Sequence, residues 1–179
     1  ETCREVGLPV VLVPTIVPGT NDHEMGDIVR YALENLDVVK SVNFQPVAHF
    51  GRYEQSDGRF SLDTAAKRLA EGFERIEPRD LMPVPCCSAY CQSATGLMPT
   101  ESGPVPVTKF LSDDLFTELS GTVDEADWME LIANTSAGKT AACTTADCCG
   151  GGGGIELPAA ADELLDRVLP VSFTGFMDA

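Results

Sequence analysis

The amino-acid sequence predicts an α/β protein, and three consecutive segments carry the prediction. The run "LPVVLVPTIVPG" is almost continuously apolar, is rich in β-branched residues and ends in Pro-Gly. An amphipathic segment, "TNDHEMGDIVRYALENLD", follows it, and "SVNFQPVAHFG" comes next. A strand, a helix and a second strand at this spacing form a βαβ unit.

The first segment predicts a strand buried on both faces, as in a parallel sheet. In the second segment Asn21 is expected to cap a helix over residues 22–36, with Glu24 three residues later as in a capping box. Apolar residues share one face of that helix: Met25, Ile28, Val29, Ala32, Leu33 and Leu36. We therefore expect residues 9–17 and 42–47 to be adjacent parallel strands, with the helix packed on one face.

A second amphipathic helix is predicted to begin at Ser61, the expected N-cap. Its apolar face comprises Leu62, Ala65, Ala66, Leu69, Phe73 and Ile76. After residue 77 prolines, glycines and cysteines become frequent, so we divide the chain into residues 1–77 and a Cys-rich α+β region, 78–179. One or two helices are expected over 112–136 and a last helix over 158–170, after which the chain is expected to trail off.

The charge is strongly acidic, with 28 acidic and 12 basic residues and a formal net charge of −16. Such a field repels nucleic acid and anionic membrane surfaces. The acidic residues are scattered, which indicates a hydrated surface adapted to high intracellular salt; a merely acidic mesophilic protein is the alternative.

Neither a membrane span nor a targeting segment is predicted. No segment approaches ~18 continuous apolar residues, and the first residues, "ETCREVGLPV", have no signal-peptide pattern. We therefore expect a cytoplasmic protein. Because these residues resemble the end of a helix leading into a strand, we also expect the chain to be part of a longer one.

Six of the seven cysteines form two clusters, CCx3C and Cx4CC, which comprise Cys86, Cys87, Cys91, Cys143, Cys148 and Cys149. Convergent thiolates are typical of iron–sulfur ligation. Zinc is an alternative, although its usual CxxC pairs are absent, and reduced structural thiols are another. Cys3, on an expected helix, is interpreted as a core residue.

Neither cluster alone offers four thiolates, so we predict that the two clusters meet in space. The glycine run Gly150–Gly154 follows the second cluster. It is interpreted either as a nest of backbone N–H groups around an anionic core or as a flexible linker. "CSAYCQSA" approaches Cx3Cx2C, but Ala94 stands where the third cysteine would be.

Two phrases, "PTIVPGTNDHE" and "NFQPV", together with "PVPCCSAYC", resemble radical S-adenosylmethionine (SAM) enzymes. The resemblance is to the archaeal branch that includes tetraether lipid synthase and pterin methyltransferase-type proteins. It covers residues 1–100 best and implies the C-terminal part of a partial TIM barrel, followed by a Cys-rich α+β auxiliary region. Ligands of such a barrel bind at the carboxyl ends of its strands.

The same resemblance implies that Thr15, Asn21, Gln45 and Arg52 contact the S-adenosylmethionine cofactor. Asn21 has a helix cap as its alternative role, and Gln45 the pairing of backbone groups at the barrel rim. His49 is interpreted as a rim residue rather than a general base.

The activity that the resemblance implies is alkylation or carbon–carbon bond formation at unactivated C–H bonds of a lipid, a pterin or a similar substrate. The six clustered cysteines would hold auxiliary 4Fe-4S centres, and a protein such as a ferredoxin would supply electrons. The family's Cx3Cx2C motif is absent from this chain, so the chain alone is expected to be inactive. A non-enzymatic iron–sulfur or zinc module is the alternative function.

Overall fold

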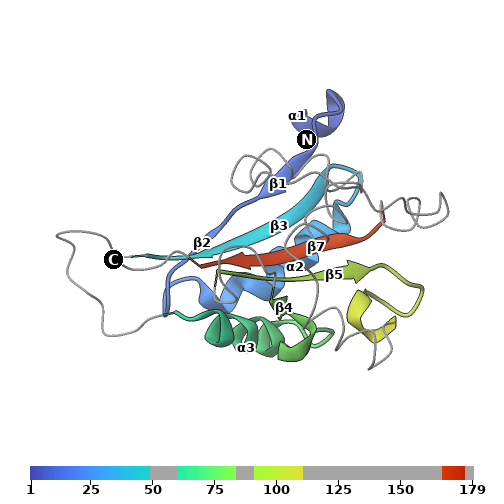
Figure 1. Cartoon of the computed structure of the whole chain (residues 1–179). Helices are drawn as coiled ribbons and strands as arrows, with labels where there is room; N and C mark the ends of the chain where they lie inside the picture. Colours follow the sequence, from blue (N-terminus) through green and yellow to red (C-terminus); the bar gives the residue numbers. More distant parts are fainter. Residues whose placement is uncertain (49–59, 84–90, 111–166, 176–179) are drawn as a thin grey trace, which may run out of the picture.

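A computed structural model describes residues 1–48, 60–83, 91–110 and 167–175, and Figure 1 shows their arrangement. The helices are α1 (Thr2–Glu5), α2 (Met25–Glu34) and α3 (Leu62–Gly72), with 3-10 turns η1 (Asp22–Glu24), η2 (Pro78–Asp80) and η3 (Val107–Phe110). The strands are β1 (Val10–Leu12), β2 (Thr15–Ile16), β3 (Val39–Pro46), β4 (Met82–Pro83), β5 (Gln92–Met98), β6 (Val105–Pro106) and β7 (Leu169–Thr174).

These strands form one mixed sheet in the order β1-β3-β7-β5-β4, with β2 paired to β3 and β6 paired to β5. β1, β2 and β7 are all parallel to β3, whereas β5 is antiparallel to β7, β4 and β6. The expected parallel pairing of residues 9–17 with 42–47 is confirmed, and so is the α/β class. The described sheet does not establish a partial TIM barrel.

The apolar faces of α2 and α3 cover one side of this sheet (Figure 1). Phe44 of β3 and Phe173 of β7 stack beneath them, with ring centroids 5.1 Å apart. Met25, Val29 and Leu69 are fully buried in the same cluster. The amphipathic faces expected from the sequence therefore form the core, which holds the parallel strands in register.

The two helices approach each other closely at a pair of glycines, Gly26 and Gly72. Arg30 of α2 links the two helices at this crossing, because its Nη2 donates to the carbonyl oxygen of Gly72 at 2.6 Å. The guanidinium of Arg30 also lies 5.6 Å from the ring centroid of Phe73, within the range of a cation–π contact.

The helix starts agree with the sequence only in part. Ser61 caps α3 as expected, and its Oγ accepts a hydrogen bond from the backbone N–H of Thr64 at 3.2 Å. Asn21 precedes η1 but makes no side-chain cap hydrogen bond, so the predicted cap is wrong. The predicted helix 22–36 begins as this 3-10 turn and continues as α2 only to Glu34.

Two long strands were not predicted. β5 covers residues 92–98, and β7 includes Leu169 and Pro170, where the last helix was expected to continue. The rest of that predicted helix up to 166, and the helices expected over 112–136, lie outside the described residues. Strands from both sides of residue 77 share the sheet, and the division into domains at that residue stays a prediction.

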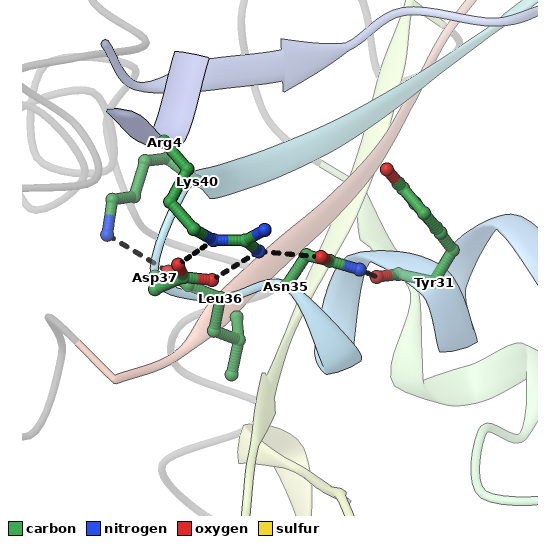
Figure 2. Close-up of polar contacts among 6 residues, drawn as sticks. All are labelled: Arg4, Tyr31, Asn35, Leu36, Asp37 and Lys40. Carbon is green, nitrogen blue, oxygen red and sulfur yellow. Dashed lines mark hydrogen bonds and ion pairs between the residues drawn. The ribbon is translucent and has the colours of Figure 1, made fainter. Parts of the chain in front are cut away.

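A polar cluster joins α1 to the turn between α2 and β3 (Figure 2). The Arg4 guanidinium bonds both carboxylate oxygens of Asp37 and donates to Asn35 Oδ1 at 2.8 Å. Asn35 Nδ2 in turn donates to the carbonyl oxygen of Tyr31 at 2.8 Å, at the end of α2.

The hydrogen bond from Arg4 holds the pKa of Asp37 below its ordinary value. Because the folded-state pKa is the lower one, the pair stabilises the fold above the ordinary carboxyl pKa. That contribution is lost as the pH falls through the lowered pKa.

Replacing Thr95 with valine should raise the free energy of unfolding by about 1 kcal/mol. The Thr95 hydroxyl is buried on the helix side of β5, and the described part of the chain offers it no hydrogen-bond partner. Valine keeps the shape and removes the desolvated oxygen. Chemical denaturation measures the change. Thr108→Val is the matched comparison and should be destabilising, because its hydroxyl bonds Asp80 at 2.5 Å. A loss of stability in Thr95→Val would contradict the prediction.

Candidate functional site

Two of the four predicted cofactor residues lie side by side. Thr15 of β2 and Gln45 of β3 are Cα partners in the parallel register. Both stand at the carboxyl ends of their strands, where open parallel sheets bind ligands. Arg52, like His49, lies outside the described residues.

The third residue, Asn21, shapes the loop that follows β2. Its Oδ1 accepts from the backbone N–H of Val17 at 2.8 Å, and its Nδ2 donates to the carbonyl oxygen of Thr15 at 2.9 Å. Asn21 therefore fixes the backbone that carries Thr15, and the amide has two protein partners already.

Asp22 completes the same loop. Its Oδ1 accepts from the N–H of Gly19 at 2.9 Å, and Gly19 has the positive φ of 72° that favours glycine. The Asp22 carboxylate is nearly buried and lies 3.3 Å from Arg68 Nε on α3. The loop after β2 is thus tied to the helical layer.

Further polar residues extend from Thr15 and Gln45 across the sheet. Thr174 is the Cα partner of Gln92, and Gln45 and Thr174 each come one residue after the paired Phe44 and Phe173. In the neighbouring row, Ser172 is paired with both Asn43 and Ala94. We call the six polar residues of these two rows the polar face: Thr15, Gln45, Asn43, Ser172, Thr174 and Gln92.

The polar face lies on the side of the sheet away from α2 and α3. Its residues alternate along β3 and β7 with Phe44 and Phe173, which are buried under the helices. Thr174 Oγ1 donates to Asn43 Oδ1 at 3.0 Å, so the two side chains meet on this side. All six residues are uncharged; Thr15 is exposed and the other five are half-buried.

The sequence did not reveal four of these residues. Asn43, Ser172, Thr174 and Gln92 join the site only through the pairing of β3, β7 and β5, and the last two strands were not predicted. The available signal was the alternation of small or polar with apolar residues in "QSATGLM" and "LPVSFT".

One of the six cysteines that were predicted to ligate a metal, Cys91, lies among the described residues. Within the described ranges no group of three or more His, Cys, Asp or Glu side chains is placed to hold a metal ion. Cys91 is half-buried immediately before β5, and its carbonyl oxygen accepts from the N–H of Gly175 at 2.7 Å. The other five clustered cysteines lie outside the described residues, so the meeting of the two clusters stays a prediction. The interpretation of Cys3 as a core residue is wrong, because Cys3 lies in α1 and is half-buried, outside the core cluster.

A search for membrane spans within the described residues finds no helix that is long and apolar enough to cross a bilayer.

Three known proteins are similar in sequence to this chain. The chain is 34% identical over 145 residues to 7,8-dihydro-6-hydroxymethylpterin dimethyltransferase of Methanocaldococcus jannaschii. It is 32% identical over 62 residues and 30% identical over 78 residues to the GTP 3′,8-cyclases of two Pseudomonas putida strains. These similarities support a radical SAM family, at modest identity. No family model matches the chain.

The chain spans much less than the full length of these relatives. The matched region is 66% of this chain but 29% of the dimethyltransferase, and 35% and 43% of this chain but 19% and 23% of the two cyclases. Radical SAM proteins in general use a 4Fe-4S cluster and S-adenosylmethionine.

Proposed function

We propose that this chain is the C-terminal portion of a radical SAM iron–sulfur enzyme that acts on unactivated C–H bonds by alkylation or carbon–carbon bond formation. The observation that carries the proposal is the 34% identity over 145 residues to the dimethyltransferase. The chain alone is expected to be inactive, because the Cx3Cx2C motif is absent from it.

The end of the polar face formed by Thr15 and Gln45 suits the uncharged portion of S-adenosylmethionine. The hydroxyl of Thr15 and the amide of Gln45 offer donors and acceptors side by side. Asn21 Nδ2 donates a hydrogen bond to the carbonyl oxygen of Thr15, which fixes the backbone that carries the Thr15 hydroxyl. In this proposal Thr15 and Gln45 bind the cofactor, Asn21 positions them and Arg52 adds a charged contact.

Bound S-adenosylmethionine and its cluster would supply the hydrogen-abstracting chemistry. The protein's own contribution is to hold cofactor and substrate together at the carboxyl ends of the parallel strands. The thiolates of Cys86, Cys87, Cys91, Cys143, Cys148 and Cys149 suit auxiliary 4Fe-4S centres in their donor chemistry. The electrons for these centres would come from a reductant protein such as a ferredoxin.

An unpaired sheet edge supports the view that this chain works within a longer enzyme. Among the described strands β1 pairs only with β3. An open groove of about 570 Å³ lies beside β1 and α2, with Leu12, Ile28 and Tyr31 in its lining. Val13 and Tyr31 are half exposed there. A further strand of the same polypeptide, parallel to β1 and followed by a helix, would cover both the edge and the groove.

The substrate class is proposed from the relatives' names together with the polar face. A dihydropterin and GTP both contain a 2-amino-4-oxopyrimidine ring, and a ring heterocycle suits amide and hydroxyl partners. This favours a pterin-like substrate over a lipid chain, which would require an apolar surface.

Anaerobic reconstitution with iron and sulfide tests the proposal. The full-length protein should cleave S-adenosylmethionine to 5′-deoxyadenosine with a strong reductant, whereas the 179-residue chain should take up iron and yield none. Cys86→Ala or Cys148→Ala should lower the visible absorption of the reconstituted chain, because each removes a thiolate ligand.

Cys3→Ala is the matched control and should leave the absorption unchanged, because Cys3 lies in α1 and belongs to neither cysteine cluster of the sequence. Stoichiometric 5′-deoxyadenosine from the 179-residue chain would overturn the assignment of the chain as a portion of the enzyme. Bound zinc without iron uptake would instead identify a non-enzymatic module.

A further inference from the structure

We infer that the part of the polar face centred on β7 is a binding platform for the hydrogen-bonding edge of a neutral, planar 2-amino-4-oxopyrimidine heterocycle. The platform comprises Asn43, Ser172, Thr174 and Gln92. This inference rests on the proposed function and goes further, because it names the residues that select the substrate.

The strand order gives the platform its shape. β7 lies between β3 and β5, so the short side chains of Ser172 and Thr174 form a floor with an amide on either side. Neighbouring strands are about 4.8 Å apart, which separates the backbones that carry Asn43 and Gln92 by about 10 Å. A flat ring can lie over Ser172 and Thr174 and reach both amides at its edges.

One of the two amides is oriented by the protein. Thr174 Oγ1 donates to Asn43 Oδ1 at 3.0 Å, which restrains the Asn43 amide. The Asn43 amide group is therefore set before a ligand arrives, and preorganised groups lose less entropy on binding. Gln92 begins β5 and is paired with Thr174 through the backbone, so its position along the floor is fixed as well.

The chemistry of the platform selects for a neutral ligand edge. An amide side chain accepts through its oxygen and donates through its nitrogen, and it can bond a ring N–H and an adjacent C=O together. None of the four residues carries a charge. Phosphate groups are bound by Arg and Lys, and the net charge of −16 adds repulsion. The bound portion is therefore the ring and not a phosphate tail.

Binding to the full-length protein, measured by calorimetry without reductant, tests the platform. The probes are 6-hydroxymethylpterin, guanosine, adenosine and a 6-hydroxymethyllumazine, in which oxygen replaces the 2-amino group. We expect the pterin and guanosine to bind and the lumazine to bind at least about tenfold more weakly, since it leaves a platform group without its partner. Adenosine should not displace the pterin.

Asn43→Leu and Gln92→Leu should each weaken pterin binding by about tenfold. Asn35→Leu is the matched control, because it makes the same change at the C-cap of α2, where Asn35 bonds Arg4 (Figure 2). It should leave the affinity unchanged even if it lowers the melting temperature. Melting curves of all three variants establish that the platform variants remain folded.

Two results would overturn the inference. Adenosine and S-adenosylmethionine competing for the platform as strongly as the pterin would show that it binds the cofactor's adenine. Pterin binding that is absent, or unaffected by both platform variants, would show that no such platform exists. These readouts need neither iron nor turnover. If the protein binds the pterin through Asn43 and Gln92 but forms no 5′-deoxyadenosine, the proposed function is refuted. The assignment of the platform as a pterin-binding site would still hold.

Discussion

Replacing Gly26 with alanine should lower the free energy of unfolding by about 3 kcal/mol. A Cβ atom at this position would lie 2.1 Å from the carbonyl oxygen of Gly72 and 2.6 Å from its carbonyl carbon. Both atoms belong to the backbone of α3, so no side chain can turn away to make room. The helices would have to separate, and the fully buried Met25 and Val29 would lose packing against the sheet. Chemical denaturation of the variant measures the loss.

Gly72→Ala is the matched control at the same crossing. Its Cβ would lie 3.5 Å from the nitrogen of Gly26, which is ordinary van der Waals contact. Alanine is favoured over glycine in a helix by up to about 1 kcal/mol, so this variant should be neutral or slightly stabilising. If both substitutions lowered the free energy of unfolding equally, the distance between the two helices would not depend on the absence of a Cβ atom at residue 26.

The crossing matters for the candidate site because the loop after β2 depends on it. Gly26 stands one residue after Met25, which begins α2, and the loop before this helix carries Asn21 and Asp22. Asp22 pairs with Arg68 on α3. A shift between the helices would therefore disturb both the loop and the backbone of Thr15 that Asn21 holds.

The sequence allowed the βαβ unit to be predicted because its signals are local. A continuous apolar strand, an amphipathic helix and a second strand follow one another within about 40 residues. Thr15 and Gln45 were implied by the resemblance to radical SAM enzymes, in which ligands bind at the carboxyl ends of the barrel strands. Their pairing in the structure follows from the parallel register.

The other half of the sheet depends on contacts between distant residues. Asn43 and Thr174 are 131 residues apart and yet hydrogen-bonded. In β5 the core positions include Ser93 and Thr95, so the apolar alternation that marks a strand is weak. In β7 the preceding residues continue a helical apolar pattern, and Pro170 interrupts the strand signal. No local pattern could place Gln92 beside Thr174.

The second large effect is expected at Asp80, which is 1% exposed. Asp80→Ala should lower the free energy of unfolding by about 3 kcal/mol. The carboxylate accepts from Thr108 Oγ1 at 2.5 Å and from the backbone N–H of Glu77 at 2.8 Å. Lys109 Nζ lies 3.4 Å from it. Alanine would leave the buried Thr108 hydroxyl and the N–H of Glu77 without their acceptor, and η2 would lose its tie to η3.

Asp63→Ala serves as the control, because Asp63 is an exposed carboxylate paired with Lys67 at 2.8 Å within α3. Exposed pairs of this kind contribute less than about 1 kcal/mol. A double-mutant cycle of Asp80→Ala with Thr108→Val isolates the buried hydrogen bond, and its coupling energy should be about 2 kcal/mol. If Asp80→Ala costs no more than Asp63→Ala, the contacts around Asp80 do not hold η2 to η3. Because η3 contacts β5, the position of Gln92 would then have to be fixed by the pairing of β5 with its neighbouring strands β7, β4 and β6.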